Sequence, residues 1–258
     1  MIIDFKKYSS VRIGQTFEVE VLDNVREFDG FIIGGANNLL ISPEPKKMGI
    51  LSSHFDFIKI IDKNSHHITL QIGCATKSST IYQFAKKYNL KGFEFLTKIP
   101  GQLGGLLKMN AGLKDCDIST NLSKIFTAKG EIKRDEINFS YRFNPLKMPF
   151  FWAEFKLEFG FDYEKDKTLK LARSNQPSGA SFGSIFKNPK DNYAGRLIEA
   201  VGLKGFRKND AKLSEKHANF LINQKNASFE DALFLIELAR KRVFEEFGIL
   251  LENEVIIL

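Results

Sequence analysis

The chain has 258 residues, of which 43% are hydrophobic and 27% charged, a composition typical of a globular protein with a sizeable core. No apolar run approaches the roughly 18 residues that a membrane-spanning helix needs, and the N-terminus does not resemble a signal peptide, so we expect a cytoplasmic protein without a membrane partner. The net charge of +7 permits an anionic partner. Because the lysines are scattered rather than grouped into basic blocks, we expect no nucleic-acid partner.

The first half of the chain is predicted to be rich in strands. Short β-runs occupy 17–22 ("FEVEVL") and 28–42 ("FDGFIIGGANNLLIS"), where a Gly-Gly-Ala-Asn-Asn turn separates two strands. The segment 55–73 contains two runs of alternating residues on either side of a turn at 63–65, which predicts a β-hairpin. An amphipathic helix with an apolar stripe is predicted over 77–92, ending near Gly92. Residues 99–112 ("IPGQLGGLLKMNAG") carry so much glycine that we expect a loop there.

The second half begins with further strands over 123–137 and 150–161. After Lys165 the pattern of short strands ends. A polar linker over 172–184 precedes a helix from Ala194 that stops at Gly202, a strand in 218–223, and a helix that a capping box starts at Ser228 and Gly248 ends. The tail 249–258 is strand-like. The predicted fold class is therefore α+β, with a β-rich body and a smaller α/β unit from about 174 to 248.

Cysteine and histidine patterns predict no metal site. Cys74 and Cys116 lie far apart without a CxxC motif or a nearby histidine, so we expect two buried small residues rather than a disulfide or a zinc site. His66 and His67 should point to opposite faces of the predicted hairpin. His217 is expected to start a strand as an edge histidine.

Two glycine-rich stretches indicate a nucleotide-like ligand. Alone, the turn at 34–38 is most simply a tight strand connection, although its glycines let the backbone approach a phosphate. The stretch 99–112 adds a second such surface, with Asn110 as a hydrogen-bonding group. Two such stretches in one β-rich half favour a bound cofactor over two coincidental turns.

Two further residues each leave two interpretations open. Arg142, between aromatic residues in "FSYRFNPL", could present its planar fork to a carboxylate or phosphate, or stack on Phe143 at the surface. Glu254, in the apolar tail, points either to solvent or into a polar site. The stretch "SFGSIFKNP" at 181–189 reads by composition as a turn with two serines.

The motifs occur in a characteristic order. "FIIGGANNLLIS", "GFEFLTKIPGQLGGLLKMNAG", "YR", "GSIFKNP", "AGRLIEAVGLKG", "SEKHANFLIN" and "LENEV" follow one another over nearly the entire chain. In this order and spacing the chain resembles the UDP-N-acetylenolpyruvoylglucosamine reductase (MurB) family, in a short bacterial form.

This resemblance implies a fold and a reaction. The fold is the two-subdomain FAD-binding fold of the vanillyl-alcohol-oxidase (PCMH) type, with subdomains over about 1–50 and 51–173, a substrate-binding subdomain over 174–248, and a terminal strand over 249–258 that returns to the active site. In the implied reaction NADPH reduces non-covalently bound FAD, which passes hydride to UDP-N-acetylglucosamine enolpyruvate. A monomer is expected. The alternative is another FAD-dependent oxidoreductase of this fold that oxidises an alcohol or hydroxy acid.

The resemblance also assigns residues. Ser184 becomes the proton donor, and Arg142 and Glu254 stabilise the charge that develops on the substrate. Tyr141, Asn188 and His217 align with substrate-binding positions. The implied flavin-binding residues are Gly34, Gly35, Ala36, Asn37, Asn38, Leu39, Pro100, Gly101, Gly104, Gly105, Asn110 and Gly112. No metal ligand is implied.

The chain departs from the long form of the family in two places. The long form has a phosphate-binding lysine before the serine, where this chain offers Asn175 or Arg173 and neither is assigned the role. The stretch from Arg142 to Ser184 is too short for the long form's tyrosine-bearing loop.

Overall fold

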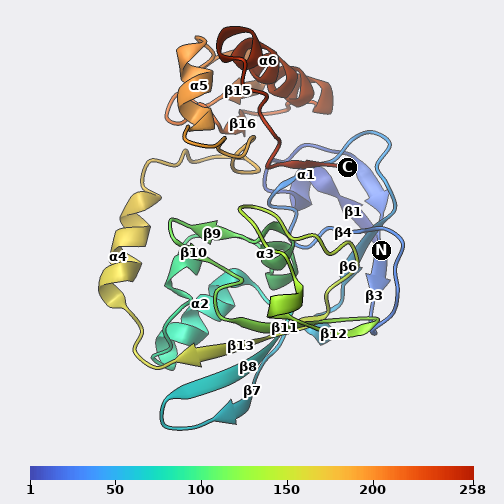
Figure 1. Cartoon of the computed structure of the whole chain (residues 1–258). Helices are drawn as coiled ribbons and strands as arrows, with labels where there is room; N and C mark the ends of the chain where they lie inside the picture. The colour runs from blue at the N-terminus through green and yellow to red at the C-terminus, as the bar shows by residue number, and fades with distance from the viewer. The chain divides into compact units, whose positions relative to one another are not determined.

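The computed structural model describes all residues from 1 to 258, and the chain forms two compact units (Figure 1). Unit 1 comprises 1–18, 36–46 and 175–258, and unit 2 comprises 19–35 and 47–174. Each unit has its own hydrophobic core. Both combine helices and strands, so the predicted α+β class is confirmed.

A five-stranded antiparallel sheet forms the centre of unit 2. Its strands, in spatial order, are β12 (Gly130–Lys133), β11 (Leu122–Thr127), β13 (Trp152–Glu158), β8 (His67–Gly73) and β7 (Ile58–Lys63). Alternate residues of β8, Ile68, Leu70 and Ile72, are buried, as the period of a strand requires. The predicted hairpin is confirmed, and the side chain of Asn64 accepts the amide protons of His66 and His67 at its turn.

Smaller elements complete unit 2. A parallel sheet contains β3 (Glu20–Leu22), β6 (Met48–Leu51) and β4 (Phe31–Ile32), and a short hairpin pairs β9 (Gly112–Leu113) with β10 (Cys116–Asp117). The helices are α2 (Ser78–Lys87), α3 (Leu103–Met109) and α4 (Tyr163–Ala172), with short 3-10 turns at Ser53–Phe55, Glu94–Leu96 and Arg134–Glu136. The helix predicted over 77–92 is confirmed as α2, although it ends at Lys87.

The prediction of a loop over 99–112 is wrong, because Leu103–Met109 forms helix α3. Leu103, Leu106 and Leu107 fall on one helical face and are all buried. Burying these side chains contributes about 1.5–3 kcal/mol each, which exceeds the cost of about 1 kcal/mol for each glycine in the helix. Asn110 ends α3 in the left-handed conformation.

Helix α4 has no counterpart in the sequence prediction. Half of its side chains are charged, and Leu169 is its one fully buried apolar residue. The Asp162 side chain caps its N-terminus by accepting the amide proton of Lys165. Tyr82 of α2 donates its hydroxyl proton to the buried Asp166 carboxylate. Contacts with other segments therefore stabilise α4 more than its own periodicity does.

Unit 1 gathers segments from both ends of the chain. Near the N-terminus lie β1 (Ile2–Asp4), α1 (Phe5–Tyr8) and β2 (Thr16–Glu18), and β5 (Leu39–Leu40) runs parallel to β17 (Ile256–Ile257). The remainder is α5 (Ala194–Ala200), the antiparallel strands β14 (Arg207–Lys208), β15 (Ala211–Leu213) and β16 (Leu221–Asn223), and α6 (Phe229–Phe247).

The predicted helix boundaries in unit 1 are confirmed. Ser228 and Asp231 form the capping box of α6, and Gly248 ends that helix in the left-handed conformation. The strand-like tail is shorter than predicted, since only Ile256–Ile257 is a regular strand. His217 does not start a strand but lies in the turn before β16.

The compact units differ from the linear division predicted from the sequence. Unit 2 ends at Ser174 and unit 1 resumes at Asn175, which is where the composition of the sequence changes. However, 1–18 and 36–46 belong to the same unit as the C-terminal segment rather than to that of 51–173. The assignment of FAD-binding and substrate-binding roles to these regions stays a prediction. None of the helices is both long and apolar enough to cross a bilayer.

Candidate active site

Ser184 and Glu254 are neighbours in unit 1. The carbonyl oxygen of Ile185, the residue after Ser184, accepts the backbone N–H of Glu254 at 2.8 Å. The Asn38 side chain donates to the Glu254 carbonyl oxygen at 2.8 Å. These bonds bring together three residues that lie far apart in the sequence and that were predicted to serve the same reaction.

The loop around Ser184 is held by backbone and side-chain bonds. Ser184 forms an antiparallel bridge with Phe220, and the Asn219 side chain both accepts from and donates to the backbone of Phe186. Ser181 accepts the amide proton of Gly183, which has a left-handed φ of 88°. Ser181 is thus a turn residue, whereas the hydroxyl of Ser184 makes no hydrogen bond within the chain.

His217 lies near this loop through its contact with Phe220. The two rings meet edge to face at 4.9 Å, and burial lowers the pKa of the imidazole. The buried Nδ1 atom has no hydrogen-bond partner. A glycine at position 195 allows the ring to pack closely against α5, because a Cβ there would lie only 2.9 Å from Cε1 of His217.

Asn188 has a structural contact as well as a predicted substrate role. Its Oδ1 atom accepts the amide proton of Ala194, the first residue of α5, at 3.1 Å. The side chain is otherwise exposed, so its amide group can still reach a ligand.

Arg142, Asn110 and Gly112 form a second group, in unit 2. The guanidinium of Arg142 donates to the carbonyl oxygen of Gly112 at 2.7 Å and to that of Asn110 at 3.4 Å. Its closest aromatic contact is Tyr141, at 5.2 Å, rather than Phe143. Arg142 itself has a left-handed backbone with φ of 54°, a conformation that a non-glycine residue adopts at a cost. Ser184 and Glu254 belong to unit 1, so a shared site with Arg142 stays a prediction.

Part of the glycine-rich backbone of unit 2 is open to a ligand. A Cβ at Gly105, on α3, would meet no atom within 4 Å, and Gly34 has a left-handed φ of 49°. The buried Oδ1 atom of Asn110 has no hydrogen-bond partner. An oxygen acceptor without a donor and an uncovered helix surface suit a planar ligand with N–H groups, so the residues of unit 2 fit a flavin.

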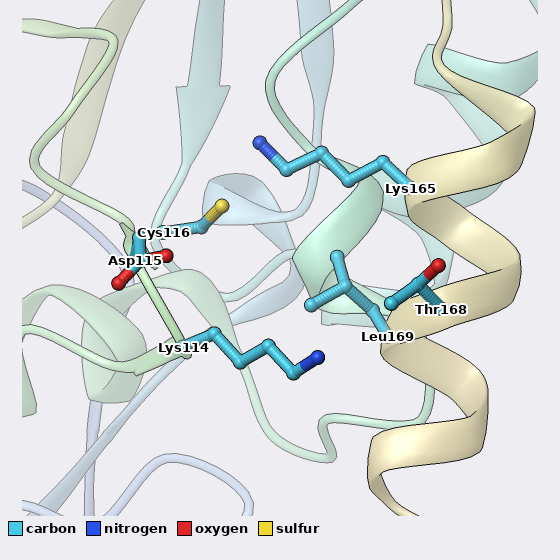
Figure 2. Close-up of a pocket in the computed structure, with 6 residues that line it drawn as sticks. All are labelled: Lys114, Asp115, Cys116, Lys165, Thr168 and Leu169. Atoms are coloured by element: carbon cyan, nitrogen blue, oxygen red, sulfur yellow. The ribbon is translucent and has the colours of Figure 1, made fainter.

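A pocket of 290 Å³ lies in unit 2, between α4 and the turn that joins β9 to β10 (Figure 2). Lys114, Cys116, Lys165 and Leu169 line it, together with Asp115 and Thr168. Cys116 is half-buried, so the expectation of a fully buried thiol holds for Cys74 only. The Cys116 side chain raises the pKa of Lys165, and the charges of Glu94 and Asp162 act in the same direction.

Arg173 is a residue of unit 2 to which the sequence analysis assigned no role. It follows the last residue of α4, and its buried Nε atom has no hydrogen-bond partner. Periodicity alone does not predict this environment, because it depends on how α4 packs.

Comparison with known proteins finds relatives that span the whole chain. The family model described as UDP-N-acetylenolpyruvoylglucosamine reductase, C-terminal domain, matches residues 175–258. The UDP-N-acetylenolpyruvoylglucosamine reductase of Campylobacter jejuni strain RM1221 is 76% identical over 258 residues, which is 100% of both chains, and that of Helicobacter pylori strain J99 is 42% identical over 99% of this chain and 98% of its own.

A solved structure of a relative has the same fold. The crystal structure of UDP-N-acetylenolpyruvylglucosamine reductase (MurB) from Thermus caldophilus superposes with a TM-score of 0.85 and 28% identity, covering 100% of this chain and 98% of that one. Together, the fold and the relatives define an oxidoreductase with mixed helices and sheets. The chain belongs to the UDP-N-acetylenolpyruvoylglucosamine reductase family.

Proposed function

We propose that the chain reduces UDP-N-acetylglucosamine enolpyruvate to UDP-N-acetylmuramate, a precursor of peptidoglycan, with NADPH as the electron source and FAD as the bound cofactor. The observation that supports this proposal is the backbone hydrogen bond from Glu254 to Ile185, which joins the segment of the predicted proton donor to the segment of the predicted carboxylate. The full-length relatives at 76% and 42% identity support it.

Ser184 is proposed to protonate the substrate. When bound, FAD supplies the hydride that adds to one carbon of the enolpyruvyl double bond. The neighbouring carbon then carries negative charge that is delocalised into the substrate carboxylate, and it is basic enough to take a proton from a well-placed hydroxyl. The hydroxyl of Ser184 suits this role because no other group of the chain holds it.

Arg142 and Glu254 are proposed to stabilise that charge. The two backbone carbonyls that bind the Arg142 guanidinium fix its orientation before the substrate arrives, and a fixed cation stabilises developing charge better than a mobile one. Glu254 would hydrogen-bond to the substrate carboxylate in its protonated form. Tyr141, Asn188 and His217 are proposed to contact the UDP-sugar.

The cofactor site is proposed to use the glycine-rich stretches. The residues are Gly34, Gly35, Ala36, Asn37, Asn38, Leu39, Pro100, Gly101, Gly104, Gly105, Asn110 and Gly112. The open backbone at Gly105 and the unpaired Oδ1 atom of Asn110 support this assignment. We further propose the two-subdomain arrangement of the vanillyl-alcohol-oxidase type, a substrate-binding C-terminal region and a cytoplasmic monomer without a nucleic-acid partner.

Absorbance spectra of the purified protein test the proposed function. We expect a flavin spectrum, directly or after FAD is added, that NADPH bleaches under anaerobic conditions and that UDP-N-acetylglucosamine enolpyruvate restores. UDP-N-acetylglucosamine, which lacks the double bond, serves as the control and should restore nothing. A protein that binds no flavin, or a reduced flavin that the substrate does not reoxidise, contradicts the proposal.

A further inference from the structure

We infer that Arg240 is a positioning residue of the proposed reaction, because its side chain holds the segment that carries Ser184 against the tail that carries Glu254. The inference deepens the proposed function and rests on it, since Ser184 and Glu254 have their roles in that reaction alone. Arg240 lies in the second half of α6 and is half-buried. All three residues belong to unit 1.

The Ser184 segment and the tail meet in a short backbone pairing. Phe186 and Asn253 form an isolated antiparallel bridge, and the carbonyl oxygen of Ile185 accepts the backbone N–H of Glu254 at 2.8 Å. The regular strand of the tail, β17, begins only after this pairing. Because so few backbone bonds fix the position of the tail here, side-chain contacts help to decide it.

The guanidinium of Arg240 contacts both residues of the bridge. Its Nη2 atom donates to Oδ1 of Asn253 at 2.5 Å, and its central carbon lies 5.6 Å from the centre of the Phe186 ring. Its Nε atom donates to the carbonyl oxygen of Leu251 at 3.2 Å. Phe186 is fully buried, so its ring is a fixed surface for the guanidinium. One side chain of α6 therefore fixes the two segments relative to each other.

The Ser184 segment is also held from its other side. The Asn219 side chain accepts the backbone N–H of Phe186 at 3.0 Å and donates to its carbonyl oxygen at 2.8 Å. Because these two bonds do not involve Arg240, the segment keeps its place when Arg240 is replaced. Loss of the Arg240 contacts should therefore move the tail, and Glu254 with it, relative to Ser184.

The alternative is that Arg240 only stabilises the fold. Its Nη1 atom donates to both carboxylate oxygens of Glu237 at 2.5 Å, an i,i+3 ion pair on an exposed face of the helix, and such pairs contribute little. A structural role predicts a lower unfolding temperature and nothing else. A positioning role predicts slower proton transfer as well, because displacement of reacting groups by about 1 Å can slow a step about a hundredfold.

Stopped-flow absorbance of the FAD-loaded protein tests the inference. We expect Arg240→Gln to slow reoxidation by saturating UDP-N-acetylglucosamine enolpyruvate about ten- to a hundredfold. Reduction by NADPH should be unchanged, because that step takes no proton from Ser184. Arg240→Lys keeps the charge but lacks the planar fork that reaches two acceptors, so it should lie between this variant and the wild type. Arg242→Gln, at an exposed position of α6, is the matched control and should keep both rates.

Asn253→Ala tests the same contact from the tail, and it decides the question if Arg240→Gln does not fold. It removes one acceptor and leaves Arg240 bonded to Leu251 and Glu237. We expect it to slow reoxidation by a smaller factor than Arg240→Gln. The double variant should lose less than the product of the two single losses, because both residues act through one contact.

A purely structural Arg240 gives different results. The inference is wrong if Arg240→Gln lowers the unfolding temperature but keeps the wild-type ratio of the two half-reaction rates. Normal reoxidation in Asn253→Ala, or single losses that multiply in the double variant, also overturns it. If the enolpyruvyl substrate does not reoxidise the reduced flavin of the wild type, the proposed function fails instead.

Discussion

Ser181 and Ser184 lie three residues apart, yet their hydroxyls have different surroundings. Ser181 accepts the amide proton of Gly183 and so stabilises a turn. Ser184 bridges to Phe220 through its backbone and leaves its hydroxyl without a partner in the chain. The contrast between the two serines gives a test of the proposed chemistry within one loop.

We predict that Ser184→Ala separates the two half-reactions. NADPH should still bleach the flavin, while reoxidation by the enolpyruvyl substrate should slow by about 10²-fold or more, the range for loss of a positioned proton donor. Stopped-flow absorbance measures both steps. Ser181→Ala is the control and should lose about 1 kcal/mol of stability rather than the proton-transfer step. Normal reoxidation in Ser184→Ala would mean that this serine is structural.

His217 is a half-buried histidine whose buried Nδ1 atom has no hydrogen-bond partner. Burial, and to a lesser extent the charge of Lys204, lower its pKa, so the folded protein favours the neutral ring. Below about pH 6.5 the unfolded chain binds more protons than the folded one, so the free energy of unfolding decreases as the pH is lowered. The stabilising contribution of the neutral ring is present above this value.

We predict that His217→Gln reduces this pH dependence. Between about pH 7.5 and 5.5 the unfolding temperature of the wild type should fall by more than that of the variant, because only the wild type must protonate a buried ring. Differential scanning calorimetry measures both. His66→Gln, at an exposed hairpin turn, should behave like the wild type. If the unfolding temperature depends on pH equally in the His217 variant and the wild type, the ring titrates alike in the folded and unfolded states.

Helix α3 shows at the level of an element how packing overcomes weak local propensity. Gly104 and Gly105 are consecutive in the helix but face different surroundings. A Cβ at Gly104 would lie 3.3 Å from both the Cβ and the carbonyl oxygen of Cys74, whereas one at Gly105 would meet nothing within 4 Å. The first glycine permits close packing, and the second leaves a surface open.

We predict opposite responses to alanine at these two positions. Gly105→Ala should stabilise the ligand-free protein by about 0.5–1 kcal/mol through helix propensity, and it should weaken FAD binding if the open face contacts the flavin as proposed. Gly104→Ala should gain less stability or lose some, because Cys74 must move. Urea unfolding and FAD titration of both variants measure these effects. Unchanged FAD affinity in Gly105→Ala would remove this face from the proposed cofactor site.

At the scale of the whole molecule, the two units contain separate cores. Leu235 of α6 belongs to the core of unit 1, and Leu70 of β8 belongs to the core of unit 2. The only tryptophan of the chain, Trp152, lies on β13 in unit 2. Its fluorescence therefore reports on one unit, while far-UV circular dichroism reports on both.

We predict that substitutions in the two cores affect these signals differently. Leu235→Ala should remove about 2–5 kcal/mol from unit 1 and shift the circular dichroism transition to lower denaturant, with a smaller shift in Trp152 fluorescence. Leu70→Ala, a matched truncation in unit 2, should shift the fluorescence transition. Identical shifts of both signals in both variants would show that the chain unfolds as one cooperative unit.

Local interactions account for the elements that were predicted correctly. The α6 helix carries its own capping box and C-terminal glycine, and the β7–β8 hairpin carries its own turn. The ordered motifs likewise pointed to the reductase family, which the relatives confirm. Their assignment of Ser184, Arg142 and Glu254 as site residues stays a prediction. The signals for these elements lie within a few residues of one another, and the signal for the family lies in the order of motifs along the chain. The sequence by itself therefore determined these elements and the family.

The tertiary structure decided whatever depends on distant segments. The β5–β17 pair joins residues 39–40 to 256–257, and the Ile185–Glu254 backbone bond joins the Ser184 loop to the C-terminal tail. Packing against the rest of unit 2 stabilises the helices α3 and α4. Arg173 acquires its environment in the same way, through the face of α4 that it shares with Leu169. Periodicity reports which face of an element is apolar, but not which distant segment covers it, because chain closure and long-range packing select that partner.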